Sequence, residues 1–597
     1  MHIAYKHKNL EAVLIVVKGL ASAMVVASFV LLFGFDKPLV HAKVLYALQL
    51  TLLLVFIAGK VIRLLNAQIK REFLLANWFE IPLLAGLATL LLGAGRWFGD
   101  PETVRHFAIG IYLVVEVLIK SCNICVNMAA SGKSPTRTLI ASFLVLIIAG
   151  TGLLMLPKSS TGANLGFTDA LFTATSATCV TGLIVKDTGS DFSLMGQIII
   201  LTLIQLGGLG IIVFGVVFAL LLGQALSLRE SVAMQDLLSA GTLGRIGNMI
   251  VFILFGTIVI EAVGAVSMFG MWDDVPGRIN SVGQQWFCSI FHSISAFCNA
   301  GFSLFSDSFV SYNKSWAIYT VICPLIIIGG LGFIVLYDLA GITVDRVKGF
   351  CRRHLQGRYR ISMQLPAPRR MRLQTKIVLC VSSVLIVFGM LAVFLFGHYA
   401  PGGSAGGNPT VLDALFQSIT ARTAGFNTVD ISALSPSARL IIILLMFIGG
   451  SPGSTAGGIK TVTLAVIVMT TITALRKRQE VEMFNRSVRI VVVGRAITVT
   501  LLFVAVLFVA ALALSITERS SGISMSDVMF ETASALGTVG LSTLTTEQTA
   551  ALTSVGKLII IATMLIGRLG PLTLLAALTF NIKPARYNYP DEAVIVG

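Results

Sequence analysis

Long apolar stretches recur along this sequence, and twelve of them have the length that a helix needs to cross a bilayer, about 20 residues. They lie near residues 11–34, 44–65, 74–95, 104–128, 137–157, 195–222, 247–271, 315–343, 375–399, 438–475, 489–515 and 556–580. Charged residues make up only 12% of the chain, against roughly 25% in soluble proteins. Because too few polar groups are present to cover soluble domains of this length, we expect an all-α integral membrane protein.

The positive charge of the sequence is concentrated in two loops between apolar stretches. The net charge is +16, and much of it lies in segments 346–372 and 476–489. Loops rich in lysine and arginine stay in the cytoplasm, so both segments are expected there. Counting the apolar stretches outward from them places both termini in the cytoplasm and predicts a multi-pass protein of the cell inner membrane. Since topology accounts for the charge, no nucleic acid is expected as a partner.

Four shorter apolar segments lie between the long ones, and they share one plan. Each has a phenylalanine, a run of serine, threonine and alanine, and then a glycine. The segments are 168–182, 286–301, 411–425 and 527–540, with Phe172, Phe291, Phe416 and Phe530 followed by Gly182, Gly301, Gly425 and Gly540. The separations are 10, 10, 9 and 10 residues, which leaves the register of the third copy open. Segments too short to cross a bilayer predict re-entrant half-helices.

Each short segment has a long one on either side. This pattern predicts four tandem repeats of helix, re-entrant pore loop and helix around a pseudo-fourfold pore, preceded by about four extra transmembrane helices. The expected regions are an N-terminal helical part, two repeats, a basic cytoplasmic loop, two more repeats and a cytoplasmic tail. Their boundaries are 1–136, 137–240, 241–345, 346–372, 373–487, 488–584 and 585–597. Close helix packing through small residues is the alternative explanation.

The glycine of each short segment suits a turn that binds a cation. A cation crosses a membrane only where oxygen atoms replace its hydration shell, and rings of backbone carbonyls do this without a fixed charge. Aiming successive carbonyls at one axis needs backbone angles that glycine adopts readily. A half-helix also directs the negative end of its dipole toward the cation. Four such loops would line one ion pore.

The loop sequences TATSATCVTGL, SAFCNAGF, TARTAGFNT and ALGTVGLST resemble those of the Trk/Ktr/HKT superfamily of potassium transporters, and the resemblance covers residues 137–597. It implies potassium uptake through a channel-like pore with a filter of backbone carbonyls, and no enzyme activity. The implied potassium-binding filter is Val180, Thr181, Gly182, Asn299, Ala300, Gly301, Thr423, Ala424, Gly425, Thr538, Val539 and Gly540. Plant relatives that prefer sodium have serine at the position of Gly182, so glycine favours potassium. The extra N-terminal spans depart from the usual bacterial pattern and have no assigned function.

The long stretch 438–475 is interrupted by IGGSPGSTAGGIK at 448–460. Glycine and proline break a helix, and open backbone inside a membrane is tolerated only where it lines a cavity or is buried in protein. We expect a movable gate below the filter, which the resemblance supports; a static kink is the alternative. The expected gate residues are Gly449, Gly450, Ser451, Gly453, Gly457, Gly458, Lys460 and Arg568.

Arg568 lies in the sequence GRLG, where the first two repeats have GGLG at 207–210 and 329–332. An arginine at bilayer depth costs roughly 2.5–3.5 kcal/mol on insertion scales, so we expect it to face the pore. In the superfamily this arginine is an electrostatic barrier near the gate. A buried ion pair with an acidic residue is the alternative. Lys460 either serves the gate or extends toward the membrane surface.

Two other functions fit parts of the sequence. Sodium-coupled potassium symport uses broken helices and acidic residues at the membrane midplane, and Glu80, Glu116 and Glu261 lie in or near apolar stretches. An intramembrane serine protease would use the GxSxG strings at 402–406 or 449–453. Neither string lies in the strand, turn and helix that make this motif a nucleophile.

The sequence contains no nucleotide-binding fingerprint. No cofactor is expected on this chain, and potassium at the filter residues is the expected metal. The eight cysteines predict neither disulfides nor a zinc site, because they lie mostly in apolar stretches and no second CxxC pair exists. In Trk and Ktr systems a separate cytoplasmic ring subunit binds the nucleotide. The expected partners are therefore potassium or sodium ions, the lipid bilayer, a second copy in a homodimer and such a regulatory subunit.

Overall fold

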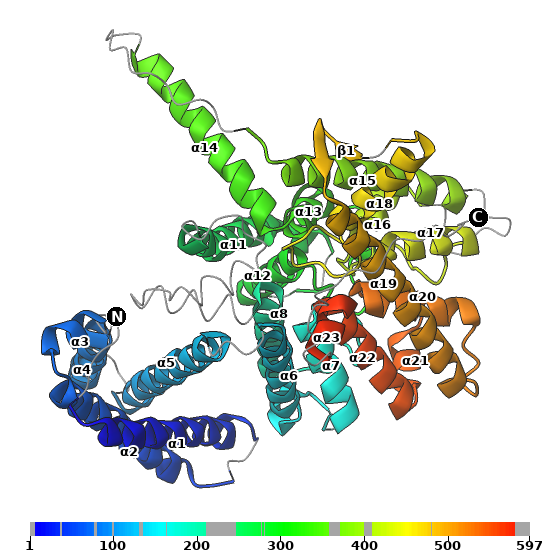
Figure 1. Ribbon diagram of the computed structural model, residues 1–597. Coiled ribbons are helices and arrows are strands. Elements are labelled where there is room, and N and C mark those ends of the chain that lie inside the picture. The colour runs from blue at the N-terminus through cyan, green and yellow to red at the C-terminus, as the bar shows by residue number, and fades with distance from the viewer. Residues whose placement is uncertain are drawn as a thin grey trace.

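The structure is a computed structural model that describes residues 6–35, 39–76, 80–97, 101–130, 135–162, 164–210, 246–275, 278–279, 281–356, 370–398, 409–478 and 480–578. These residues are mostly helical (Figure 1), which confirms the helical fold class. Three predicted features lie partly or wholly outside the described residues. They are the tail 585–597, the stretch 195–222 from residue 211 onward, and residues 357–369 of the basic loop.

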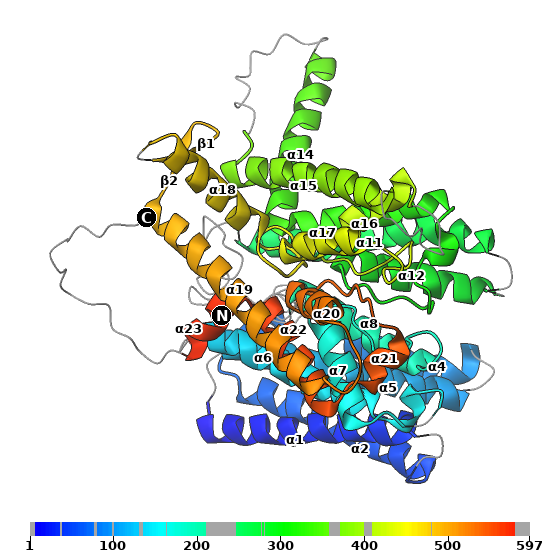
Figure 2. The same cartoon turned by 90° about the vertical axis from the view of Figure 1, so that its right-hand side faces the viewer.

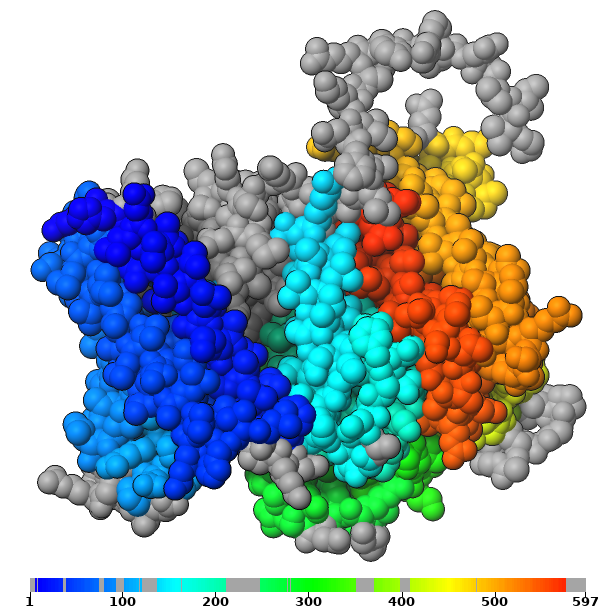
Figure 3. Space-filling view, turned by 90° about the horizontal axis from the view of Figure 1, so that it is seen from below, coloured from blue at the N-terminus to red at the C-terminus, as the bar shows by residue number. Residues whose placement is uncertain are grey.

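The N-terminal helices form a bundle with its own core. The bundle contains α1 (Lys8–Phe33), α2 (Ala42–Asn66), α3 (Lys70–Ala76), α4 (Glu80–Trp97) and α5 (Pro101–Ala130). Val25, Phe56 and Tyr112 are among its buried core residues. Figure 3 shows this bundle, in blue, as a block beside the cyan helices that follow it.

A cluster of paired charges is buried inside this bundle. Lys60 on α2 is 7% exposed and donates a hydrogen bond to Glu116 on α5, and its Nζ lies 3.4 Å from Oε1 of Glu80. The hydroxyl of Tyr112 donates to the same Glu116 carboxylate at 3.2 Å. Arg63, one turn further along α2, pairs with Glu11 at 2.6 Å. A charge in such a position needs a partner, and the bundle supplies one for each of these cations.

The remaining helices form four groups, each with a long helix, a short helix and a second helix that ends at a break. The first group is α6 (Pro135–Leu154), α7 (Phe167–Thr178) and α8 (Leu194–Leu209). The second is α11 (Ile246–Met268), α12 (Val282–Cys298), α13 (Cys323–Leu331) and α14 (Phe333–Gln356). The third is α15 (Leu373–His398), α16 (Val411–Thr420), α17 (Pro436–Phe447) and α18 (Thr461–Leu475), and the fourth is α19 (Ile490–Thr517), α20 (Met525–Gly537), α22 (Ser554–Leu569) and α23 (Pro571–Leu578).

Short elements connect these helices. They are η1 (Pro157–Ser159), η3 (Phe269–Asp274), η4 (Val310–Tyr312), η5 (Ile318–Ile322) and α21 (Thr546–Ala551). A small hairpin of β1 (Val481–Met483) and β2 (Arg486–Val488) pairs Val481 with Val488 and Met483 with Arg486. The all-α prediction missed this hairpin.

Three buried cores join the four groups in a closed order. One core contains Ile204 of the first group, Phe297 of the second and Phe416 of the third. Another joins Met446 of the third group to Phe530 of the fourth. The last core joins the fourth group back to the first, through residues that include Met564 and Phe172. Figure 2 shows the second and third groups on one side and the first and fourth on the other.

Six described helices are long and apolar enough to cross a membrane: α1, α2, α6, α11 with η3, α15 and α19. A seventh crossing results if the bent pair on either side of Gly332 counts as one span. This confirms a multi-pass membrane protein. Because α4 and α5, at the third and fourth predicted spans, are not among the six, the count of four N-terminal spans stays a prediction.

The second helix of the second, third and fourth groups is broken, whereas the sequence predicted a break only in the third. In the first group α8 ends at Leu209, and Gly210 is the last described residue there. The predicted span 315–343 bends by 104° at Gly332. Gly210, Gly332 and Gly570 share one backbone conformation, with φ of 81°, 86° and 82°. An L-residue helix does not continue through such angles. In the third group residues 448–460 occupy the break and separate α17 from α18.

Candidate functional site

Three of the four short helices begin at a side-chain cap, and all four end close to one another. The side chains of Ser281, Thr410 and Ser524 accept backbone N–H groups at the starts of α12, α16 and α20, which fixes where these helices begin. Each of the four is followed by a glycine with positive φ, at Gly182, Gly301, Gly425 and Gly540. We call these four residues the glycine ring. Converging helix C-termini add their partial negative charges at this place.

The glycine ring is closed by contacts that run in one direction from copy to copy. A Cβ placed on Gly182 would lie 2.5 Å from the carbonyl oxygen of Ala300, and one on Gly301 would lie 2.8 Å from that of Ala424. A Cβ on Gly425 would lie 2.5 Å from the carbonyl oxygen of Val539. The fourth contact, from Gly540 to the carbonyl of Thr181, returns to the first copy. No side chain fits at any ring position without moving the backbone of the next copy.

A second residue of unusual conformation precedes each ring glycine by two positions. These residues are Val180, Asn299, Thr423 and Thr538, with φ of 56°, 59°, 84° and 49°. Positive φ in a residue with a Cβ is uncommon and strained. Alternating left-handed and right-handed residues turn successive peptide groups to the same side. The same alternation in all four turns gives them one common carbonyl arrangement.

The backbone hydrogen bonds of the turns show the register of the third copy. In copies one, two and four, the residue before the glycine donates its N–H to a carbonyl five positions earlier, as Thr181 does to Ser176 at 2.8 Å. In the third copy Ala424 donates to Thr420, four positions earlier, at 2.9 Å. The missing residue therefore lies between the end of α16 and Thr423. From Thr423 onward the third turn has the register of the others.

One hydroxyl in each copy braces the turn, and the sequence reasoning did not single out these residues. The oxygens of Ser176 and Ser534 accept the N–H groups of Gly182 and Gly540, each at 3.1 Å. In the other two copies the hydroxyl donates to the carbonyl that follows the glycine: Ser295 to Phe302 at 2.8 Å and Thr420 to Phe426 at 2.6 Å. An alignment of the four copies on their glycines, with one gap in the third, would have revealed them.

A second set of residues, which the sequence reasoning missed, directly follows the phenylalanine of each short segment. These residues are Thr173, His292, Gln417 and Glu531, and all are buried. In the second copy Nε2 of His292 accepts the N–H of Leu304 at 3.3 Å. In the fourth copy Oε1 of Glu531 accepts the N–H of Thr543 at 3.0 Å. Both acceptors hold the third residue after a ring glycine, although their chemistry differs.

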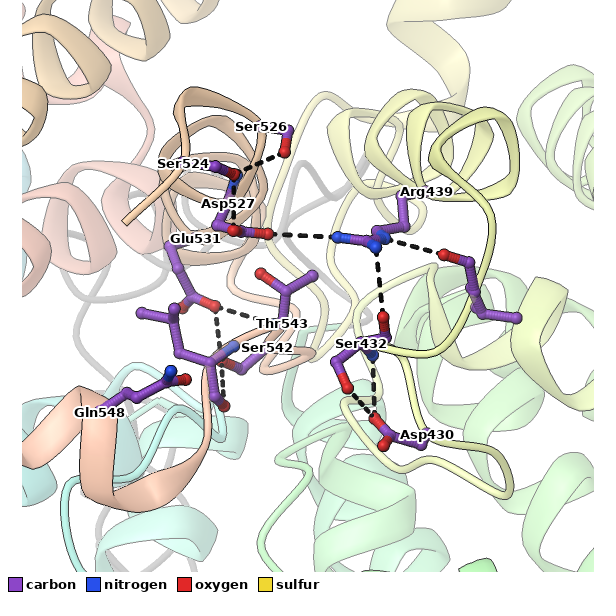
Figure 4. A network of polar contacts seen from close by, with 12 residues as sticks. Asp430, Ser432, Arg439, Ser524, Ser526, Asp527, Glu531, Ser542, Thr543 and Gln548 are labelled. Atoms are coloured by element: carbon purple, nitrogen blue, oxygen red, sulfur yellow. Dashed lines mark hydrogen bonds and ion pairs between the residues drawn. The ribbon is translucent and has the colours of Figure 1, made fainter. Parts of the chain in front are cut away.

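A cavity of about 150 Å³ has the four ring glycines on its wall. The residues that follow each glycine also line it, among them Asp187, Asn427 and Ser542. Beside it, Arg439 on α17 pairs with Asp527 on α20 at 3.3 Å and donates to the carbonyls of Leu434 and Ser432 (Figure 4). This network ties the third group to the fourth next to the cavity.

The segment 448–460, which we call the break loop, packs against the turns on the side of the residues that precede the glycines. Its two ends lie together, since Gly449 donates its N–H to Ile459 at 2.9 Å and Thr461 donates to Gly450 at 3.0 Å. At its centre, a Cβ on Gly457 would lie 2.9 Å from the carbonyl oxygen of Gly537. Ser451 donates to the carbonyl of Leu331 at the break of the second group. Ser451 and Thr455 are fully buried.

Arg568 joins the break loop to the first group. Its guanidinium donates to the carbonyls of Thr455, Gly207 and Gly208, the second at 2.6 Å. Gly207 and Gly208 are in the last turn of α8, where a cation is favourable. The described ion pairs do not include Arg568, so its recorded partners are backbone carbonyls and not the acid of the alternative interpretation. Lys460 stays within its own loop, where Nζ donates to the carbonyl of Ala456 at 2.6 Å.

The predicted site residues thus fall into two places in the structure. The twelve residues of the expected filter lie in the four turns of the glycine ring, and the expected gate residues lie in or against the break loop. Buried threonine hydroxyls at Thr181, Thr423 and Thr538 have no hydrogen-bond partner among the described residues. Whether ions bind in these turns, and whether the loop moves, stays a prediction.

The helices and the closed arrangement of four groups define a multi-pass membrane protein of the transporter class. The TrkH family, described as "Cation transport protein", matches residues 106–587. The chain belongs to this family, whose members are transporters and not enzymes. This confirms the resemblance to the Trk/Ktr/HKT superfamily.

Two relatives and one solved structure agree with this assignment. Ktr system potassium uptake protein B of Bacillus subtilis is 37% identical over 473 residues, which are 78% of this chain and 97% of that protein. The protein of the same name from Vibrio alginolyticus is 39% identical over 470 residues, 78% of this chain and 96% of that protein. The crystal structure of the potassium transporter TrkH from Vibrio parahaemolyticus shares the fold, with a TM-score of 0.56, 21% identity, and coverage of 85% of this chain and 97% of that one.

Proposed function

We propose that this chain takes up potassium across the inner membrane through a gated, channel-like pore. The two relatives at 37% and 39% identity are named potassium uptake proteins, and this chain covers nearly all of their length. The observation that carries the proposal is the glycine ring, in which four turns of one chain present their backbone to one another in a closed order. Such an arrangement suits an ion that must exchange its water shell for carbonyl oxygens.

In this proposal the filter consists of three residues in each turn: the positive-φ residue two positions before the ring glycine, the residue after it and the glycine itself. Left-handed and right-handed residues alternate there, which turns the carbonyls one way. The unpaired hydroxyls of Thr181, Thr423 and Thr538 offer further oxygens. No fixed charge is needed for selection, and the converging helix ends favour a cation.

The proposed gate is the break loop together with Arg568. The loop packs under the turn of the fourth copy, and Arg568 connects it to α8 by hydrogen bonds to carbonyls. The loop is held by hydrogen bonds to backbone carbonyls and by a few side chains, Ser451, Thr455 and Arg568 among them, so it can leave this position without unfolding a helix. A fixed positive charge beside the ion path also repels potassium while the loop is in place.

Partners follow from the same assignment. The relatives are named as proteins of a Ktr system, and we propose a separate cytoplasmic nucleotide-binding subunit that docks on the basic segments 346–372 and 476–489. We also propose a homodimer with both termini of each chain in the cytoplasm. The proposed topology requires an even number of crossings in the whole chain.

Sodium-coupled symport on the same scaffold is not favoured. Glu80 and Glu116, two acids that could hold a coupling ion, pair with Lys60 in the N-terminal bundle. The third, Glu261, accepts a hydrogen bond from Gln205 at 3.2 Å and lies outside the four turns. A protease is excluded by membership of a transporter family. Ser404 of one protease-like string lies outside the described residues, and Ser451 of the other donates to Leu331.

Growth of a potassium-uptake-deficient strain at low potassium tests the proposal, together with rubidium influx. Expression of the chain should restore both. Gly182→Ser should shift the backbone of the second turn and lower the preference for potassium over sodium. Gly522→Ser, at a glycine with the same sign of φ and open space around it, should leave the preference unchanged. Absence of rescue, with the protein present in the membrane, would contradict potassium uptake. An unchanged ion preference in Gly182→Ser would contradict the assignment of the first turn.

A further inference from the structure

A groove between α15 and α18 lies outside the proposed ion pathway. Its volume is about 390 Å³, and its lining is almost entirely apolar. Val384 on α15 and Val468 on α18 line it and are 60% and 46% exposed. Both residues belong to helices whose exposed faces are apolar, so the groove opens on the surface that faces the bilayer. This volume is within the range of sites that bind small apolar ligands.

The hairpin of β1 and β2 closes one end of the groove with an aromatic side chain in an unusual position. Phe484 and Asn485 form the two-residue turn, with φ of 49° and 61°. Turns of this kind favour asparagine, aspartate and glycine, and a bulky residue at positive φ is strained. Phe484 is nevertheless 52% exposed, and together with Met483 it lines the groove. About half of the Phe484 side chain therefore remains open to whatever occupies the groove.

Positive side chains surround the same end of the groove. Nζ of Lys376 lies 6.0 Å from the centre of the Phe484 ring. The hairpin and its flanks carry further exposed cations at Arg476, Lys477, Arg478, Arg486 and Arg489. Two acids, Glu480 and Glu482, are exposed in the same segment. Glu482 lines the groove and pairs with Arg478 at 2.8 Å, so the cations still outnumber the acids there. An apolar groove that opens to the bilayer and ends at a cluster of cations is complementary to an anionic lipid. Each lysine or arginine near an anionic lipid surface contributes about 1 kcal/mol of binding free energy.

We propose that this groove binds one anionic phospholipid of the cytoplasmic leaflet. One acyl chain lies between α15 and α18 and contacts Phe484, and the phosphate lies beside Lys376 and the arginines of the hairpin. The apolar groove opens toward the bilayer, which favours a lipid as its occupant over the regulatory subunit proposed above for the basic segment 476–489. The site is independent of the glycine ring, so a test of lipid binding does not depend on the outcome of the transport experiments.

Native mass spectrometry of the full-length protein tests this site, with phosphatidylglycerol and phosphatidylcholine as the probes. We expect phosphatidylglycerol to stay bound in preference to phosphatidylcholine. Val468→Trp, which fills the groove, should remove the retained lipid. Lys376→Gln should weaken retention about fivefold, the effect of one cation at an anionic surface, and Lys376→Arg should restore it. The matched controls are Val263→Trp on the exposed face of α11 and Lys186→Gln, both outside the groove.

Three outcomes would overturn the proposal. Equal retention of the two lipids would show that the cations do not select the headgroup. Loss of lipid in Val263→Trp as well as in Val468→Trp would show general delipidation. A change from dimer to monomer in Val468→Trp, with lipid retention unchanged, would assign the groove to a contact between two copies of the chain. The melting temperature of each variant, measured in parallel, separates these results from failure to fold.

Discussion

The guanidinium of Arg568 lies 2.6 Å from the carbonyl oxygen of Gly207, and so joins the end of α22 to the end of α8 across the break loop. The same side chain donates to Thr455 of the loop. One residue of the fourth group thereby holds a segment of the third group against the first. A lysine could not reproduce this, because its single ammonium lacks the planar fork of donors.

Replacement of this arginine should open the proposed gate. In Arg568→Gln the loop loses its charged donor, and a hydrogen bond to a charged group contributes about 1.5–3 kcal/mol. We expect basal rubidium influx to rise about tenfold, the ratio that corresponds to about 1.4 kcal/mol. Arg439→Gln is the matched control, since Arg439 also donates to backbone carbonyls but lies away from the loop. Unchanged or lower influx in Arg568→Gln would contradict a closing role.

Deletion of residues 449–458 should also raise basal influx. The ends of this segment already lie side by side, because Ile448 and Ile459 form a parallel bridge. Since parallel neighbours cannot be joined directly, a short glycine linker replaces the deleted residues and leaves α17 and α18 in place. If the break loop blocks the pathway, rubidium influx increases in vesicles without a regulatory subunit. A second deletion protein that also carries Gly540→Ala shows whether the additional flux passes through the glycine ring. A closed or unchanged pore would count against a gate.

Gly540→Ala should abolish transport and should lower stability by more than the strain of a positive φ alone. A Cβ at this position enters the space of the Thr181 carbonyl, so the ring must deform. Gly522→Ala is the control, because Gly522 has φ of 69° but no heavy atom within 4 Å of the added Cβ. We expect Gly522→Ala to lose about 1 kcal/mol of unfolding free energy from the positive φ and Gly540→Ala to lose more, because its added Cβ meets the backbone of the first copy. Only Gly540→Ala should lose rubidium influx. Normal influx in Gly540→Ala would exclude the ring from the ion path.

Lys60→Met should destabilise the N-terminal bundle strongly. The substitution leaves Glu116, which is 6% exposed, without its partner, and an orphaned buried charge costs about 3–5 kcal/mol. Arg478→Gln, which breaks an exposed pair with Glu482, should cost at most about 0.5 kcal/mol. The double variant Lys60→Met with Glu116→Leu should recover most of the loss. Thermal unfolding of the purified proteins measures all three, and equal effects of the two single variants would contradict this interpretation.

The pair of Arg278 and Asp307 should make stability depend on pH in acid. Burial raises the pKa of Asp307, but hydrogen bonds from Arg278 and Ser311 outweigh it and hold this pKa below the ordinary value of 3.8. The folded protein therefore binds the Asp307 proton less tightly than the unfolded chain. The stabilising contribution is complete above the ordinary value and is lost as pH falls through the lowered one.

Asp307→Asn tests this dependence. The wild-type protein should exceed the variant in unfolding free energy by about 0.2–1 kcal/mol at neutral pH, the range for a partly exposed pair. The difference should vanish in strong acid. Asp274→Asn, at an exposed aspartate nearby, serves as the control. A difference between wild type and Asp307→Asn that persists below the lowered pKa would contradict the assignment.

The residues of the glycine ring could be found from the sequence because the requirement on them is local. A turn with positive φ needs glycine, and four copies of one short plan place it each time. The long apolar helices were predictable for a similar reason, since span length is read directly from the run of apolar residues. Both predictions rest on properties of neighbouring residues alone.

The breaks at Gly210, Gly332 and Gly570 could not be predicted in this way. The sequences GGLG and GRLG lie within apolar stretches, and hydropathy reports the length of an apolar run but not a change in its direction. The break loop was visible because proline and several glycines occur together there. The hairpin was missed because Phe484 occupies a turn position where glycine or asparagine is the usual signal.

The residues that follow the four phenylalanines could not be recognised from the sequence because their chemistry differs. His292 and Glu531 accept equivalent backbone N–H groups, yet histidine and glutamate share no motif. Only their position after the phenylalanine relates them, and that position has no meaning until the four copies are superposed. Arg568 was noticed as an isolated charge, but its partners are carbonyls of distant segments, which no sequence pattern specifies.

The glycine with positive φ that ends the second helix at Gly210, Gly332 and Gly570 bears on the break loop of the third group. A continuous helix has no place for added residues, whereas at Gly332 the chain already changes direction by 104°. A second helix that ends at such a glycine therefore offers a point where residues can be added without distorting a helix. The third group has its added residues, 448–460, at the corresponding point between α17 and α18.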